Sequence, residues 1–394
     1  MTCLTVISSK IITNIELWSR SRHILPLFKT IAMYIRTFIC FLIFFVFESN
    51  AQTSLKPISV AGSTLKDKDV IIIAETHSIT EKSDFYNAFL YSLATEQNIS
   101  NVVIESSHSE AFLFNRYLQY GDTTLLMYFQ DSGSHRRIVA MKNMYDLLPV
   151  DKKIKIFGID FERMEFVVAS RIILALNHVE GTALNHFLNN FPDSLLFKIH
   201  MSPTESKLRI AIYDSARRIF EKEQAQLKAK ISTDYDVLEH IFMNPTQEAK
   251  FARRDLGMFQ NMDAQLKGKP FVAIVGLYHA TYTRHQVFPS LIKLLLKNGL
   301  CTEEKLTIIN EISNKKYLVN RLWDKEGTPP QYTDGVAGPE YFTDVDSAMY
   351  RGYHNYFSGD TYVLAHKSLF NDIVFKGNHG LDEYFVFFGN RPLN

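Results

Sequence analysis

In Val70-Ile71-Ile72-Ile73-Ala74-Glu75-Thr76-His77, a run of apolar, mostly β-branched residues stops at an acid and a histidine, and this pattern indicates the fold class. Three later apolar runs stop in a similar way, at 102–104, 154–159 and 271–276. Apolar runs of this length, separated by helical stretches, are typical of buried parallel strands. We therefore predict an α/β fold with a mostly parallel central sheet flanked by helices.

Ionisable residues follow each of the four runs. Glu75 and His77 follow the first, Glu105 the second, Asp160 the third and His279 the fourth. Ligands of open α/β sheets bind outside the carboxyl ends of the strands. If the four runs are neighbouring parallel strands, these side chains meet in one cleft.

The stretches between the runs have helical periodicity, and 165–266 contains no good strand. We interpret 165–266 as a helical insertion between the third and fourth strands. It could cover the cleft as a lid, or form a packed subdomain with no contact to substrate. Further helices are expected at 81–97, 109–120, 135–148 and 286–297, and further strands at 305–310, 360–365 and 384–388.

Residues 1–51 are predicted to be a signal peptide, with an upstream part that a misassigned start codon would explain. Lys29 and Arg36 precede the ten-residue apolar stretch 38–47, and Ser49-Asn50-Ala51 fits the small-residue cleavage rule. Crossing a bilayer takes about 20 apolar residues. We therefore expect an exported, periplasmic or extracellular protein, residues 52–394, with no stable membrane span after cleavage.

The composition excludes some classes of partner. The 394 residues include 43 basic and 42 acidic side chains, so the net charge of +1 gives no electrostatic footprint for nucleic acid. Cleavage after residue 51 would leave Cys301 as the single thiol, which permits no internal disulfide. A small-molecule substrate is the partner we expect, and the oligomeric state does not follow from the sequence.

The residue types at the strand ends suit acid–base chemistry. Glu75 and His77 are two apart and can point the same way, so the carboxylate could orient the imidazole as a general base. A buried Glu105 could serve as acid or base, or could favour the N-terminus of the next helix. His279 could act as acid, base or oxyanion donor, and Arg254 could stabilise developing negative charge. A purely structural role is the alternative for each, and for Asp160 it is the favoured one.

The same residues also describe a divalent metal site, whose ligands would be Glu75, His77, Glu105 and His279. The zinc motif HExxH, the nucleophile elbow GxSxG, the P-loop and the GxGxxG fingerprint are all absent. The remaining candidate nucleophile is water activated by histidine and carboxylate. This chemistry requires no cofactor, although a divalent metal is possible.

Several motifs, in this order, resemble the erythromycin esterase-like proteins over roughly residues 65–285. They are Ala74-Glu75-Thr76-His77, Val103-Ile104-Glu105, the run 115–122, Lys155 to Asp160, Arg254-Asp255 with Met258 and Asn261, and Gly276 with His279. The resemblance implies an α/β core with a helical insertion and hydrolysis of ester or lactone bonds. It implies catalytic roles for His77, Glu75, Glu105 and His279, and more loosely for Arg254.

The spacing Glu75-x-His77 also resembles a related group, the haem-uptake proteins of the ChaN type and the Tiki-type metal-dependent proteases. We predict a hydrolase of ester or lactone bonds, with amide bonds as a further class. His77 would be the general base oriented by Glu75, Glu105 would assist proton transfer, and His279 with Arg254 would stabilise the oxyanion. The alternatives are a haem- or iron-binding protein, a metal-dependent peptidase, or a non-catalytic family member.

Overall fold

A computed structural model gives the structure of the chain. The residues that it describes are 64–75, 83–128, 132–191, 203–248, 253–280, 289–313, 317–318, 332–333, 362–366 and 382–388. His77 and the predicted signal peptide lie outside these ranges.

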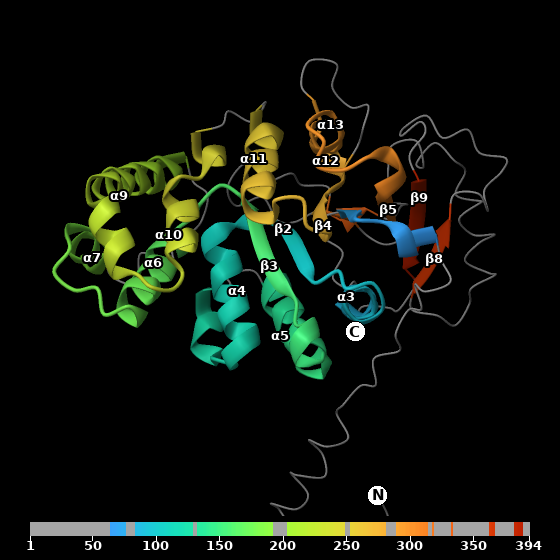
Figure 1. Cartoon of the computed structure of the whole chain (residues 1–394), viewed down its shortest axis with the longest axis horizontal. Coiled ribbons are helices and arrows are strands. Elements are labelled where there is room, and N and C mark those ends of the chain that lie inside the picture. The colour runs from blue at the N-terminus through green and yellow to red at the C-terminus, as the bar shows by residue number, and fades with distance from the viewer. Residues whose placement is uncertain are drawn as a thin grey trace, which may run out of the picture. The chain divides into compact units, whose positions relative to one another are not determined.

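A seven-stranded sheet forms the centre of the fold, in the order β3-β2-β4-β1-β5-β9-β8 (Figure 1). Every pairing from β3 to β9 is parallel, and only β8 runs antiparallel to its neighbour. The prediction of an α/β fold with a mostly parallel sheet is therefore confirmed. The strands are β1 Val70–Glu75, β2 Asn101–Ser107, β3 Lys155–Asp160, β4 Phe271–Gly276, β5 Leu306–Ser313, β8 Tyr362–His366 and β9 Asp382–Phe388. A separate pair comprises β6 Tyr317–Leu318 and β7 Tyr332–Thr333.

Helices cover both faces of this sheet. Figure 1 shows α11, α12 and α13 on one face, α3, α4 and α5 on the other, and α6, α7, α9 and α10 gathered beyond the edge strand β3. Their bounds are α3 Ser83–Glu96, α4 His108–Tyr120, α5 Ser132–Leu147, α6 Glu165–Leu176, α7 Ala183–Asn189, α9 Pro203–Lys230, α10 Tyr235–Phe242, α11 Arg254–Leu266, α12 Leu277–Ala280 and α13 Leu291–Lys297. Short 3-10 helices lie at Thr64–Asp67, Thr123–Tyr128, Val150–Lys152, Pro245–Glu248 and Glu303–Lys305.

The four apolar runs are strands because both of their faces are buried. Every residue of β1 and β4 is buried, and alternate residues such as Ile72 and Ala74 pack under α11 and α13. Side chains alternate across a strand, so Ile71 and Ile73 bury against the helices of the other face. Two covered faces explain why these strands are continuous apolar runs.

The two ends of helix α4 are set by local sequence, and its start determines where strand β2 ends. The Ser107 hydroxyl accepts a hydrogen bond from the Glu110 amide and begins the helix directly after β2. Gly121 ends it in the left-handed conformation, at φ 69°, with its N–H bonded to the Tyr117 carbonyl. The chain therefore turns two residues beyond Glu105, at Ser107, which leaves the Glu105 carboxylate near the carboxyl edge of the sheet.

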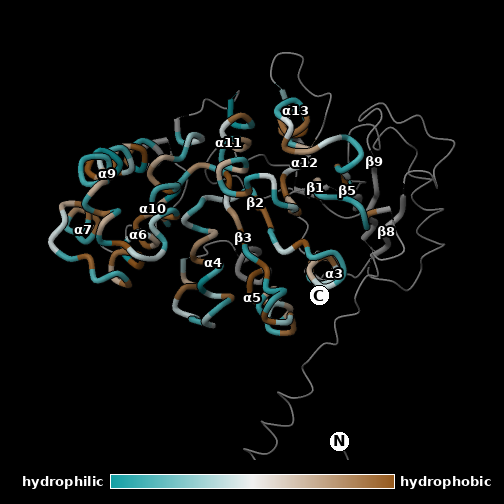
Figure 2. The backbone as a smooth tube through the Cα atoms, in the orientation of Figure 1, coloured by the Kyte–Doolittle hydropathy of each residue, from teal (hydrophilic) through white to brown (hydrophobic). Residues whose placement is uncertain are grey.

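Between β3 and β4 the described residues are helical, and aromatic rings pack these helices together. The ring of Phe242 stacks on Phe220 at 5.0 Å between centroids and meets Phe166 edge-on at 6.1 Å. Figure 2 shows hydrophilic and hydrophobic residues alternating along α9 and α10, as expected for helices with one buried face. Within the described ranges, no helix combines the length and apolar character that crossing a bilayer requires.

Candidate active site

Five ionisable side chains meet at the carboxyl ends of β2, β3 and β4, and we call them the strand-end cluster: Glu105, Asp160, Arg254, Asp255 and His279. Arg254, at the start of α11, donates from Nε and Nη2 to the two carboxylate oxygens of Asp160, at 2.8 and 2.5 Å. Its Nη2 also donates to Glu105 Oε1 at 2.8 Å. One guanidinium group therefore joins the ends of two adjacent strands.

His279 lies between two carboxylates of this cluster. Its Nδ1 is 2.5 Å from Asp255 Oδ1, and its Nε2 is 3.3 Å from Glu105 Oε1. Burial alone would lower the pKa of His279, but the hydrogen bonds and charges of Asp255 and Glu105 raise it to about 10. The imidazole is therefore protonated at neutral pH, and it is a proton donor rather than a base.

Backbone groups fix the two carboxylates that hold His279. Glu105 Oε2 accepts a hydrogen bond from the Gly276 amide at 2.6 Å, which ties the end of β2 to the end of β4. Asp255 Oδ2 accepts from the Leu291 amide at 3.0 Å, at the start of α13. Both carboxylates are thus oriented by rigid elements as well as by the histidine.

Arg254, like His279, is held by two carboxylates. Burial would lower the pKa of Arg254, but the hydrogen bonds and charges of Asp160 and Glu105 raise it above the ordinary arginine value. Its side chain is 20 % exposed, and Asp160 beneath it is 2 % exposed. The guanidinium therefore positions Glu105 and neutralises it, and its contacts to two carboxylates limit its freedom to reach a substrate.

The structure brings together three of the residues that the sequence singled out for catalysis: Glu105, Arg254 and His279. Asp160, for which a structural role was favoured, joins them through Arg254. His77, the predicted general base, lies outside the described residues. The strand-end convergence therefore holds for β2, β3 and β4.

Glu75 begins on the other face of the sheet. Ala74 packs in the core under α11 and α13, and side chains alternate along a strand, so Glu75 points toward the α3 side. The register places it level with Gly276, and the residue is 8 % exposed.

Two acids in or beside the site, Asp255 and Glu162, form more contacts than the sequence indicated. The sequence singles out Asp255 only as part of the motif Arg254-Asp255, yet the Asp255 carboxylate contacts His279 Nδ1. Glu162 is fully buried and accepts hydrogen bonds from the amides of His108 and Ser109, the Ser109 hydroxyl and the Asn244 side chain. Burial raises the pKa of Glu162 to about 8 despite these donors.

Two members of the strand-end cluster already bind other side chains: Glu105 accepts a hydrogen bond from Arg254, and His279 contacts Asp255 and Glu105. Among the described residues, no three His, Cys, Asp or Glu side chains are arranged to hold a metal ion. The predicted ligand set also includes His77, whose position is not described.

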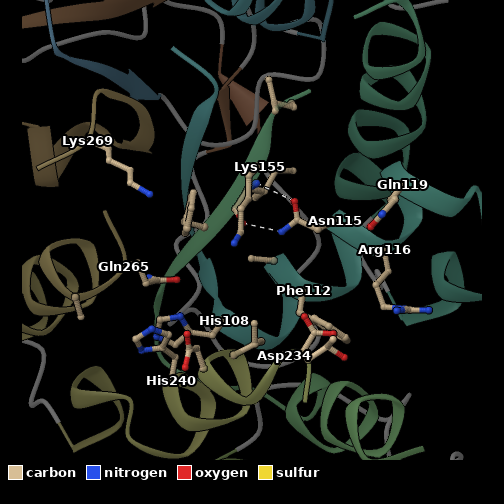
Figure 3. A pocket seen from close by; sticks show the side chains of 18 of the residues that line it. His108, Phe112, Asn115, Arg116, Gln119, Lys155, Asp234, His240, Gln265 and Lys269 are labelled. Atoms are coloured by element: carbon tan, nitrogen blue, oxygen red, sulfur yellow. Dashed lines mark hydrogen bonds between the residues drawn. The ribbon is translucent and has the colours of Figure 1, made fainter. Parts of the chain in front are cut away.

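A separate cavity of about 920 Å³ lies along the outer edge of β3 (Figure 3). His108 and His240 lie together in it with their rings stacked, 5.4 Å between centroids. Burial and the neighbouring His240 lower the pKa of His108 to about 3, so His108 is neutral. No member of the strand-end cluster lines this cavity. The acid–base groups therefore belong to a different part of the molecule.

Comparisons with known proteins support the fold. No protein-family model matches the chain, and no curated protein matches its sequence. Among solved structures, a Bacillus cereus protein superposes with a TM-score of 0.51 at 12 % identity, over 86 % of this chain and 92 % of that one. An erythromycin esterase variant, EreC, in its open conformation gives 0.45 at 14 % identity, over 69 % and 78 %. A succinoglycan biosynthesis protein gives 0.42 at 13 % identity, over 64 % and 68 %.

These similarities show an α/β fold shared with the Bacillus cereus protein. At such low identity they do not assign the chain to a family, and they transfer no activity to it. The function therefore has to be argued from the site.

Proposed function

We propose that the protein hydrolyses ester or lactone bonds, with amides as a further substrate class. The observation that carries the proposal is the pair of carboxylates around His279, held by Arg254 and backbone amides at the carboxyl ends of parallel strands. Paired acids and bases of opposite protonation state are what general acid–base catalysis requires. The resemblance of the motifs to esterase-like proteins points to the same chemistry.

In this proposal a water molecule attacks the carbonyl carbon and loses a proton to His77, which Glu75 orients. The Nε2–H of His279 lies on the side of Glu105, and its contact of 3.3 Å is longer than an ideal hydrogen bond. It can therefore turn toward the carbonyl oxygen and stabilise the oxyanion as negative charge develops there. Glu105 assists the transfer of this proton from His77 to the leaving-group oxygen, so that the acid and alcohol are released and both residues return to their starting protonation states.

The proposal is tested with the full-length chain, a panel of p-nitrophenyl esters and lactones, and parallel assays with and without a chelator. We expect turnover that the chelator does not abolish. His77→Ala and Glu105→Gln should each lower kcat by about 10²- to 10⁴-fold, the usual contribution of a general acid or base. His186→Ala, on the exposed side of α7, is the matched control and should leave kcat unchanged.

Full activity in His77→Ala would remove that residue from the mechanism. An absence of turnover on every ester and lactone, with or without added manganese or cobalt, would overturn the hydrolase proposal. Activity that appears only with added metal would favour the metal-dependent peptidase alternative.

A further inference from the structure

Three arginine side chains surround one aromatic ring at the carboxyl end of β3. The guanidinium carbons of Arg209, Arg254 and Arg163 lie 5.1, 5.5 and 5.6 Å from the centre of the Phe161 ring. They come from α9, α11 and the segment after β3. Since Arg254 belongs to the strand-end cluster, the other two guanidinium groups lie beside the candidate active site.

Arg163 and Arg209 differ from Arg254 in how their charge is balanced. Arg254 binds two carboxylates, whereas neither Arg163 nor Arg209 forms an ion pair with any described residue. The one hydrogen bond between the Arg209 side chain and the described residues goes from Nη1 to the Glu162 carbonyl at 2.8 Å, and a carbonyl carries no net charge. Burial and the repulsion from Arg163 lower the pKa of Arg209. Two like charges therefore share one ring without a direct counter-ion.

The acids near these arginines are engaged elsewhere. Asp160 is bound by Arg254, and Glu162 is bound by the N-terminus of α4 and by Asn244. Glu165 is buried, and burial and the charge of Glu110 raise its pKa to about 7, so a substantial fraction of it is neutral near pH 7. The site therefore offers two cationic hydrogen-bonding groups, and the acids near them are either bound by other groups or have a raised pKa.

We propose that Arg163 and Arg209 bind a carboxylate on the substrate, so that the protein acts on esters or lactones of dicarboxylic or other acid-bearing compounds. This inference rests on the proposed function. The planar forks of arginine match the two oxygens of a carboxylate.

The test compares two esters with matched acyl chains, p-nitrophenyl hemisuccinate and p-nitrophenyl butyrate. We expect the hemisuccinate to have the higher kcat/KM. Arg163→Gln and Arg209→Gln should each raise KM for the hemisuccinate about tenfold, as loss of a charge-assisted hydrogen bond implies, and leave the butyrate constants unchanged. Arg209→Lys, which keeps the charge, should recover part of the loss.

Arg218→Gln is the matched control, because Arg218 lies on the same helix, α9, and its Nη2 donates to the Ser215 hydroxyl rather than to the site. Thermal melting of each variant shows whether it folds, and Arg163→Gln provides a second route if Arg209→Gln does not. Equal kcat/KM for the two esters, or a KM for the hemisuccinate that neither glutamine variant changes, would overturn the inference.

Calorimetric titration with succinate separates this inference from the proposed function. Succinate binding that both glutamine variants weaken, in a protein that hydrolyses neither ester, would retain the carboxylate site and reject the hydrolase. Hydrolysis of both esters at equal rates without succinate binding would retain the hydrolase and reject the carboxylate site.

Discussion

At the scale of single residues, charge pairing decides what each group of the site can do. A histidine with an ordinary pKa of 6.5 would be a fair base near neutral pH. Between Asp255 and Glu105, His279 instead keeps its proton up to a pKa of about 10. The two histidines that the sequence places at strand ends are therefore expected to differ in role, with His279 as donor and His77 as base.

Replacing Asp255 with Asn should lower the pKa of His279 toward its ordinary value, because one of the two carboxylates that stabilise the imidazolium is lost. The raised pKa of His279 stabilises the fold fully below about pH 6.5, and this contribution is lost as pH rises from there through about 10. The variant should lose less stability over that range. NMR titration of the imidazole and urea unfolding at several pH values measure both effects.

The companion substitution Asp263→Asn, on the same helix but outside the cluster, should change neither quantity. An unchanged His279 pKa in Asp255→Asn would show that Asp255 does not hold the charge of the histidine.

At the scale of elements, side-chain amides protect the open edge of the sheet. The Asn115 side chain both donates to the Ile156 carbonyl at 2.8 Å and accepts from the Ile156 amide at 2.9 Å. Gln265 donates to the Gly158 carbonyl at 3.0 Å. An edge strand with free backbone groups is a template for pairing with another chain, and these amides occupy the groups where such a strand would bind.

Asn115→Leu should leave the backbone N–H and C=O of Ile156 without their partner. We expect a loss of about 1–3 kcal/mol in the free energy of unfolding, the usual effect of stranding buried polar groups, and increased self-association through β3. Gln119→Leu, one turn further along α4 and exposed, is the control. Urea unfolding measures the stability of the two variants, and light scattering measures their self-association. Equal stability and equal self-association in the two variants would contradict the edge-protection role.

At the scale of the whole molecule, Glu162 connects the sheet to the helices between β3 and β4. Its carboxylate binds the start of α4 and Asn244, its amide donates to Gln247, and its carbonyl accepts from Arg209. This junction allows α9, 28 residues long, to present Arg209 at the strand ends. The helical segment thereby contributes to the candidate site, as a lid would, while it also packs around its own aromatic core.

The buried carboxyl of Glu162 should make stability fall as pH rises. Its pKa is about 8 in the folded chain and 4.5 ordinarily, so between these values the folded state binds more protons than the unfolded state. The slope approaches at most about 1.4 kcal/mol per pH unit. Glu162→Gln should flatten this slope in urea unfolding between pH 5 and 8, and the exposed Glu180→Gln should not. A slope that Glu162→Gln leaves unchanged would place the pH dependence elsewhere.

The sequence predicted the sheet well because burial on both faces leaves a local signal. The four apolar runs became β1 to β4, and the helix expected at 109–120 is α4, His108–Tyr120. The later strands were also found, although β5 extends three residues beyond its expected end, β8 begins two residues later and ends one residue later, and β9 begins two residues earlier. Runs of β-branched residues and turn glycines are local features of the sequence, so strands and turns can be predicted from them without tertiary information.

The candidate site was predictable only in part. Glu105, Asp160 and His279 are near one another because parallel strands end at one edge of the sheet, which their positions after apolar runs already implied. The amino-acid sequence alone therefore determined the strands, their direction and the residues at their carboxyl ends. The tertiary structure decided which acid contacts which cation: Asp255 contacts His279, and Arg254 contacts both Glu105 and Asp160. It also decided that the Glu75 side chain starts from the opposite face of the sheet. These pairings depend on strand order and on the face from which each side chain starts, and both are set by packing between segments far apart in the chain.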